Sequence, residues 1–173
     1  APIGSSSPPI VVNGVVIVGA AFSFSGAPES PAAVKGKVTA YDVATGELRW
    51  RFNTIPEPHE FGANSWGGDA ASYTGNAGVW APMSADPELG YVYLPVEAPT
   101  SDYYGGHRAG DNLYGQSLVC LDATTGERVW HFQTVHHPIW DYDLSAPPVL
   151  LDITVEGKEI PAVAQITKQG LTF

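Results

Sequence analysis

Three residues that lie far apart in the sequence have side chains suited to a chemical site. Asp141, in Ile139-Trp140-Asp141-Tyr142-Asp143, can accept a proton from a hydroxyl group within hydrogen-bond reach. Lys168 is a cation that can stabilise oxygen atoms gaining negative charge, and the indole of Trp80 can stack against a flat ring. Each also has an ordinary structural explanation: a carboxylate capping a turn, a solvated surface lysine and an aromatic residue of the core.

A sequence repeat supplies elements that would position these side chains. Segments 38–52 and 118–132 share Asp, Thr, Gly, Glu, Trp and Phe at identical offsets. Each predicts a strand ending at the Asp, a tight turn whose Gly takes a positive φ, and a second strand carrying the Trp. We interpret each as the outer hairpin of a four-stranded antiparallel blade, with Trp50 and Trp130 buried in equivalent places.

Apolar runs around turn residues predict the inner hairpins. The first spans 8–20 with a type I′ turn at Asn13-Gly14, and the second spans 80–96. A third begins at Pro147 and turns near residues 156–158. The sequence therefore predicts an all-β fold, a partial β-propeller of about two and a half blades. We expect blades at about 8–53 and 79–134, an incomplete blade at about 146–173, and an inserted loop at about 54–78.

A blade buries its faces against neighbouring blades, and propellers usually close with four to eight of them. Two and a half blades do not close a ring. We therefore expect residues 1–173 to be a fragment of one propeller domain, completed by further blades of a longer chain. The alternative is self-association through the open edges.

Composition excludes several classes of function. The net charge of −10 would repel nucleic acid and anionic membrane surfaces. No apolar run reaches the roughly 18 residues of a membrane span. The single cysteine, Cys120, lies in an apolar run and is expected to be a buried, inert thiol.

The repeated hairpins resemble the tryptophan-docking repeats of dehydrogenases that depend on pyrroloquinoline quinone (PQQ). Segment 134–143 is similar to the His-x-x-Trp-Asp segment of membrane-type glucose dehydrogenases and, more distantly, of methanol and alcohol dehydrogenases. The resemblance implies a periplasmic oxidoreductase that oxidises a sugar, polyol or alcohol and passes electrons to a quinone or cytochrome c. Non-catalytic propellers, such as outer-membrane assembly lipoproteins, carry similar repeats, so a binding or assembly module is the alternative.

The resemblance also implies site roles. It makes Asp141 the general base that takes the hydroxyl proton, and it places Lys168 against the quinone oxygens. It makes Trp80 the floor of the PQQ site, and Ser6 lies near a hydroxyl that contacts PQQ. His136 and His137 are expected to orient the loop rather than bind metal.

The metal ligands implied by the resemblance depart from the family pattern. Glu97 stands where the family has a metal-binding Asn, and Glu29 is the candidate for the second acidic ligand. Carboxylates suit Ca²⁺ or Mg²⁺, which would polarise a quinone carbonyl as a Lewis acid. We expect Trp80, Glu97, Asp141 and Lys168 to converge at one end of the inner strands. We also expect the chain alone not to oxidise a substrate.

Overall fold

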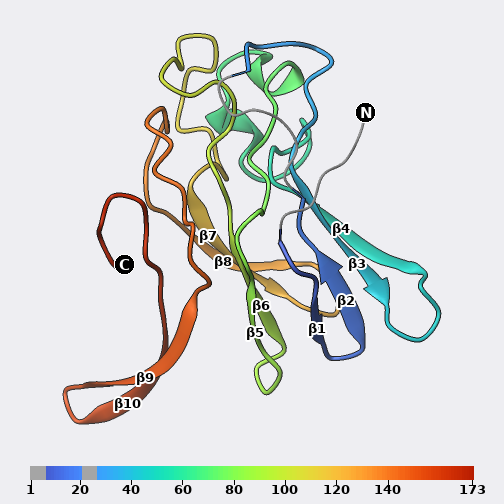
Figure 1. The fold of residues 1–173 in the computed structure, drawn as a ribbon, viewed down its shortest axis with the longest axis vertical. Coiled ribbons are helices and arrows are strands. Elements are labelled where there is room, and N and C mark those ends of the chain that lie inside the picture. Colours follow the sequence, from blue (N-terminus) through green and yellow to red (C-terminus); the bar gives the residue numbers. More distant parts are fainter. Residues whose placement is uncertain (1–6, 21–26) are drawn as a thin grey trace.

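The computed structural model describes residues 7–20 and 27–173, and its regular structure consists of strands and two short 3-10 turns (Figure 1). The strands form two four-stranded antiparallel sheets and one antiparallel pair. The predicted all-β partial propeller is therefore confirmed. Ser6 lies outside the described residues. Within these residues, no helix is long and apolar enough to cross a membrane.

The first sheet has the strand order β1-β2-β3-β4. Its strands are β1 (Ile10–Val12), β2 (Val15–Val18), β3 (Lys37–Asp42) and β4 (Leu48–Asn53). The turn from β1 to β2 is the predicted Asn13-Gly14 pair, with φ of 46° and 80°. Positive φ at both central residues is what a type I′ turn requires, and Asn and Gly tolerate it best.

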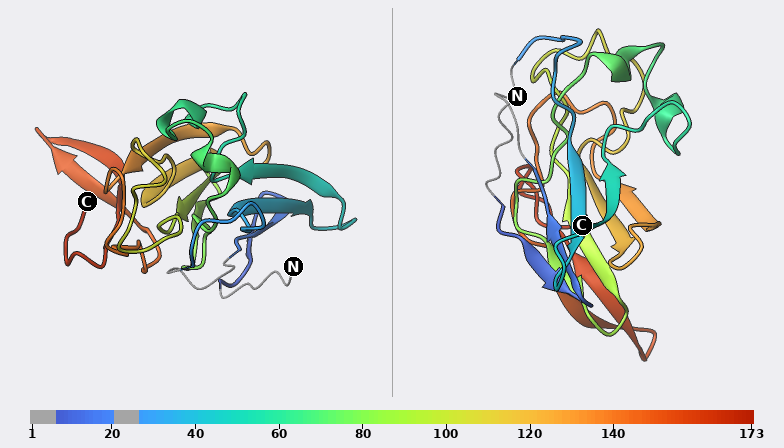
Figure 2. Two further views of the ribbon diagram at one scale, coloured as in Figure 1. Left: turned by 90° about the horizontal axis from the view of Figure 1, so that it is seen from above. Right: turned by 90° about the vertical axis from the view of Figure 1, so that its right-hand side faces the viewer.

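The second sheet repeats this topology, and a strand pair follows it. Its strands are β5 (Ser84–Asp86), β6 (Tyr91–Pro95), β7 (Ser117–Asp122) and β8 (Arg128–Gln133). The pair consists of β9 (Val149–Val155) and β10 (Lys158–Ala164). The inner strands β1, β5 and β9 are neighbours in that order. Figure 2 shows the second sheet between the first sheet and the β9–β10 pair.

The core fills the space between the first two sheets. Fully buried members include Ile17, Val38, Val92 and Leu121. The segment that follows β2 and the connection that leads to β5 approach so closely that a Cβ at Gly78 would collide with the carbonyl of Ala20. Cys120 is fully buried, as expected, and burial raises the pKa of its thiol to about 12.

The two repeat tryptophans differ in burial. Trp50 is 7% exposed, and its indole Nε1–H donates to the carbonyl of Ala123 in the next blade at 2.9 Å. Trp130 is only half-buried. The expectation that both tryptophans are largely buried holds for Trp50 but not for Trp130, which packs against Tyr93 of its own sheet and has no third outer hairpin over it among the described residues.

The long connections lie together at one end of the molecule, at the top of Figure 1, opposite the β1–β2 and β5–β6 turns. Residues 54–83 connect the two blades and contain the turns η1 (Ala63–Ser65) and η2 (Ala70–Ser72). Residues 96–116 join β6 to β7, and residues 134–148 join β8 to β9. The predicted site residues lie on or beside these connections.

Candidate functional site

Lys168 and two aspartates form the centre of the candidate site. The Lys168 ammonium donates to Asp141 Oδ2 at 2.9 Å and to Asp143 Oδ2 at 3.0 Å. The Lys168 backbone N–H also donates to the carbonyl of Asp143 at 3.0 Å. The segment after β10 is thereby fixed against the connection from β8 to β9.

Asp141 adopts a left-handed backbone conformation with φ of 55°. A non-glycine residue takes this conformation at some cost, which Asp and Asn bear best, and such residues cluster at functional sites. The Asp141 side chain keeps 29% of its surface exposed while it contacts Lys168. Asp141 is therefore both positioned and accessible.

Asp143 is the site residue that sequence reasoning did not select. It is 4% exposed, and its carboxylate accepts hydrogen bonds from the Ala98 backbone N–H at 2.9 Å and from Trp80 Nε1 at 3.3 Å. An available signal was its spacing from Asp141, because side chains two residues apart lie on the same side of an extended chain. Asp143 joins Trp80, Lys168 and the end of β6 into one cluster.

Trp80 lies near the end of the connection that leads to β5 and is half-buried. The Lys168 ammonium lies 5.6 Å from the centroid of the Trp80 ring, within the range of a cation–π contact. An aromatic face and a cation are thus presented together. This combination suits a flat, anionic ring system.

Glu97 follows β6 and is 8% exposed. Its Oε1 accepts a hydrogen bond from the Gly78 backbone N–H at 2.9 Å. Burial, followed by the nearby charge of Asp143, raises the pKa of Glu97 to about 8. Glu97 thus adds a third acidic group to the cluster of Asp141, Asp143 and Lys168.

Burial dominates the electrostatics of Asp143 as well. It raises the pKa of Asp143, and the neighbouring Asp141 raises it further, although the Ala98 N–H and Lys168 act in the opposite direction. Burial lowers the pKa of Lys168, but its hydrogen bonds to Asp141 and Asp143 outweigh that effect and raise it. Lys168 is therefore charged at neutral pH, and the cluster has more acidic groups than cations.

The structure brings together Trp80, Glu97, Asp141 and Lys168, although they are spread over 89 positions of the sequence. It places Glu29 elsewhere. The Glu29 carboxylate lies 3.8 Å from His107 Nδ1 and is 50% exposed. Within residues 7–20 and 27–173, no ion pair joins Glu29 to Lys168, the cation of the cluster.

The donor chemistry of the cluster fits a hard divalent cation, since carboxylate oxygens are the ligands that Ca²⁺ and Mg²⁺ prefer. The cluster does not form a closed cage: across residues 7–20 and 27–173, no three acidic, His or Cys side chains already group to hold a metal. Lys168 lies against both aspartates, and Glu97 is bonded to Gly78. Glu97 and Asp143 are the buried carboxylates best placed to serve as ligands.

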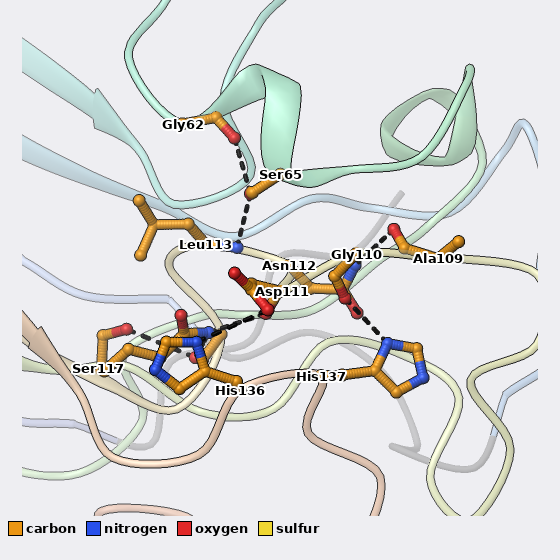
Figure 3. Close-up of polar contacts among 12 residues, drawn as sticks. Gly62, Ser65, Ala109, Gly110, Asp111, Asn112, Leu113, Ser117, His136 and His137 are labelled. Atoms are coloured by element: carbon orange, nitrogen blue, oxygen red, sulfur yellow. Dashed lines mark hydrogen bonds and ion pairs between the residues drawn. The ribbon is translucent and has the colours of Figure 1, made fainter.

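The loop within the second blade supports the segment that carries Asp141. Figure 3 shows His136 and His137 beside this loop. His137 Nδ1 lies 2.8 Å from the carbonyl oxygen of Gly110, and His136 Nδ1 lies 3.5 Å from Asp111 Oδ1. Both histidines contact the loop, in line with the orienting role expected for them.

The same loop is joined to the connection between the blades. Ser65 accepts a hydrogen bond from the Leu113 backbone N–H at 2.9 Å and donates to the carbonyl of Gly62 at 2.6 Å (Figure 3). Three connections that are separate in the sequence therefore contact one another around the site.

Comparison with known proteins identifies the family. The β-propeller domain described as PQQ: glucose/ethanol/alcohol dehydrogenase matches residues 1–173. The quinoprotein glucose dehydrogenase of Escherichia coli (strain K12) is 36% identical over 170 residues, covering 97% of this chain and 20% of that protein. The quinohemoprotein alcohol dehydrogenase ADH-IIG of Pseudomonas putida is 36% identical over 177 residues, covering 95% of this chain and 24% of that protein.

Solved structures of related dehydrogenases are also similar to this chain. The quinohemoprotein alcohol dehydrogenase ADHIIG from Pseudomonas putida HK5 gives a TM-score of 0.84 at 33% identity, covering 99% of this chain and 26% of that one. A europium-containing methanol dehydrogenase gives a TM-score of 0.80 at 27% identity, covering 95% of this chain and 30% of that one. The chain spans about a fifth to a quarter of the length of these curated relatives. The chain belongs to the family of PQQ-dependent glucose, ethanol and alcohol dehydrogenases and forms part of its β-propeller domain.

Proposed function

We propose that the intact protein oxidises a hydroxyl group of a sugar, polyol or other alcohol, with Asp141 as the general base. The observation that carries this proposal is the contact of Asp141 with Lys168 beside the face of Trp80. These three side chains supply a proton acceptor, a cation and an aromatic platform in one place. A packing role alone does not require the three together.

The two aspartates of the cluster have different environments, which suggests different roles. Asp143 is almost fully buried and accepts hydrogen bonds from Ala98, Trp80 and Lys168. It therefore orients the indole and the ammonium. Asp141 remains partly exposed, so a substrate hydroxyl can reach its carboxylate and transfer a proton to it.

PQQ, when bound, supplies the two-electron acceptor of the reaction. Trp80 would support its flat ring system, and Lys168 would lie near oxygens that gain negative charge during reduction. Glu97 and Asp143 would hold a Ca²⁺ or Mg²⁺ ion, which acts as a Lewis acid. Binding of a cation between buried carboxylates offsets their mutual repulsion, the second cause of the raised pKa of Glu97.

Partners and location follow from the same proposal. We propose a quinone or cytochrome c as the electron acceptor, the periplasm as the compartment, and further blades as the cover of the open edges. The relatives named above are glucose and alcohol dehydrogenases, which favours this substrate class.

The test compares Asp141→Asn with Asp69→Asn in the intact protein reconstituted with PQQ and Ca²⁺. Asp141→Asn keeps the side-chain shape but removes its basicity, so dye-linked turnover of the best substrate among sugars and alcohols should fall by about 10²–10⁴-fold. PQQ affinity should stay near that of the parent. Asp69, an exposed residue before η2, is the matched control and should retain turnover.

Two results would contradict the proposal. Normal turnover in Asp141→Asn would remove Asp141 from the reaction. If the parent protein does not bind PQQ when it is titrated with the cofactor, the alternative of a non-catalytic propeller that serves as a binding or assembly module would be favoured.

A further inference from the structure

A buried arginine lies behind the candidate site. Arg108, in the loop of the second blade, is fully buried. Its Nε donates to the carbonyl of Thr100 at 3.0 Å, and its Nη2 donates to the carbonyl of Ser101 at 3.1 Å. Its Nη1 donates to Asn112 Oδ1 at 2.7 Å. An arginine without solvent contact is costly unless its donors are satisfied, so this arrangement indicates a specific role.

The guanidinium also reaches the segment that carries Asp141. Arg108 Nη2 donates to the carbonyl of Pro138 at 2.6 Å. The backbone N–H of Tyr103, in the same loop, donates to the carbonyl of Ile139 at 2.6 Å. Two consecutive carbonyls, two and three residues before Asp141, are therefore held by the loop around Arg108.

Asn112 strengthens this clamp. Its side-chain amide donates to the carbonyl of Arg108 at 2.7 Å, and its backbone N–H donates to the carbonyl of Ser65 at 3.0 Å. Arg108 and Asn112 thus bind each other in both directions. The connection between the blades is tied to the same point.

The charge of Arg108 also depends on its surroundings. Burial lowers the pKa of Arg108 to about 10, and the charge of Asp102 acts against this shift and favours the charged guanidinium. Asp102 also acts electrostatically on Glu97. Arg108 is therefore linked to the Asp141 segment through its hydrogen bond to Pro138, and Asp102 supports the charge of the guanidinium that makes this bond.

From these contacts we infer that Arg108 is a positioning residue that holds segment 136–141 and thereby sets the place of the Asp141 carboxylate relative to Lys168. The inference rests on the proposed function for its catalytic consequence. The holding itself depends only on the chain described above.

The chemistry of arginine explains why this residue suits the position. The planar guanidinium has five N–H donors in a fixed fork and can bond several carbonyls in one plane. Here its side chain serves three carbonyls and one amide oxygen. A lysine retains the charge but has a single nitrogen, which cannot reach all four acceptors.

The experiment uses Arg108→Lys in the intact protein, with Arg49→Lys as the matched control. Arg49 lies on β4, its side chain is 57% exposed, and it pairs with Asp42. Hydrogen–deuterium exchange is measured without PQQ, and kcat, KM and PQQ affinity are measured in the loaded enzyme. We expect faster exchange confined to residues 134–143 and to the loop 96–116 that contains Arg108, and a fall in kcat of about 100-fold, the effect of misplacing a catalytic group by about 1 Å. PQQ affinity should be retained, and Arg49→Lys should match the parent.

Asn112→Gly is the second variant, in case Arg108→Lys does not fold. Asn112 has a φ of 58°, which glycine adopts readily, so this substitution removes the side-chain bonds without adding backbone strain. It should show the same pattern with a smaller fall in kcat. Guanidinium ion added to Arg108→Ala should restore part of the lost kcat.

Several outcomes separate the inference from the proposed function. Parallel loss of kcat, PQQ affinity and the unfolding midpoint would show a general structural role and overturn the inference. An unchanged kcat despite faster exchange at 134–143 would also overturn it. If the parent binds no PQQ, the proposed function fails, and exchange still decides the matter: local acceleration supports the inference and unchanged exchange overturns it.

Discussion

The two repeat hairpins, β3–β4 and β7–β8, have the same local structure. In each turn the Gly N–H donates to the carbonyl of the Asp that ends the first strand, at 2.9 Å for Gly46 to Asp42 and 2.9 Å for Gly126 to Asp122. Both hairpins also contain a register shift at the same relative place. Similar local sequence therefore produces similar local structure in both blades.

The hairpins differ in what covers their tryptophans. Trp50 lies over the next hairpin, where its indole donates to Ala123 and its ring packs against Gly126. Trp130 packs against Tyr93 at a centroid distance of 6.0 Å and lines open grooves beside β9–β10. The comparison shows that the neighbouring blade, rather than the repeat itself, determines how much each tryptophan stabilises the fold.

Removal of each tryptophan should give the largest difference between the hairpins. Trp50→Ala should lower the free energy of unfolding of the 173-residue chain by about 3–5 kcal/mol, because it empties a buried site and leaves the Ala123 carbonyl without its donor. Trp130→Ala should cost about 1–2 kcal/mol, because its ring is only half-buried. Urea unfolding measures both values. Equal costs would show that docking onto the next hairpin is not the source of the stability.

The turn glycines allow a sharper test, since they have the same backbone conformation. Gly46 and Gly126 have φ of 74° and 76°. A Cβ at Gly46 would meet nothing within 4 Å, whereas a Cβ at Gly126 would lie 2.6 Å from the Trp50 ring. Gly46→Ala should therefore cost about 1 kcal/mol for the left-handed backbone alone. Gly126→Ala should cost about 2–4 kcal/mol because it also crowds Trp50.

The Trp50→Ala variant provides a control for the glycine prediction. In the background of Trp50→Ala, the crowding is removed, so Gly126→Ala should cost no more than Gly46→Ala. A double-mutant cycle between positions 50 and 126 measures this coupling. An additive result would contradict the close contact between the ring and the turn.

The smallest effect is expected at the turn aspartates, whose pKa values are both lowered. Backbone N–H donors from Thr45 and Ala44 lower the pKa of Asp42. The Thr124 hydroxyl, at 2.7 Å, is the largest cause for Asp122. A lowered pKa stabilises the fold above the unfolded pKa of about 4, and this stability is lost as pH falls through the folded pKa.

Thr124→Ala should therefore raise the pKa of Asp122 toward its usual range and leave that of Asp42 unchanged. NMR titration of the two carboxyl groups measures both, with Asp42 as the internal control. The cost in stability at pH 7 should be no more than about 0.5 kcal/mol, because the group is largely solvated. This difference from the parent should shrink as pH falls and vanish once pH lies below the lowered pKa of Asp122, where the carboxyl is protonated. A cost that persists in acid would exclude the carboxylate as its origin.

The sequence marked residues with a distinctive local context, and it did not mark residues whose place depends on long-range contacts. The segment around Asp141, the position of Lys168 and the context of Trp80 each marked a residue that the structure places in one cluster. Asp143 and Arg108 did not stand out, because their importance depends on burial and on distant partners. The partners of Asp143 are 25 and 63 positions away, and Pro138 is 30 positions from Arg108. Glu29 lies beside His107, a residue 78 positions away, so its place too depends on a long-range contact.

Local sequence patterns were enough to predict the strands, the tight turns and the blade repeat. Alternation of apolar residues, Asn-Gly and Asp-to-Gly turns, and recurring tryptophans act over a few residues and need no distant partner. Tertiary structure alone decided the unequal burial of Trp50 and Trp130, the place of Asp143 and the clamp made by Arg108. The physical reason is that burial and hydrogen-bond partners across blades depend on which loops meet in space. Sequence patterns that act over a few residues do not encode these long-range contacts.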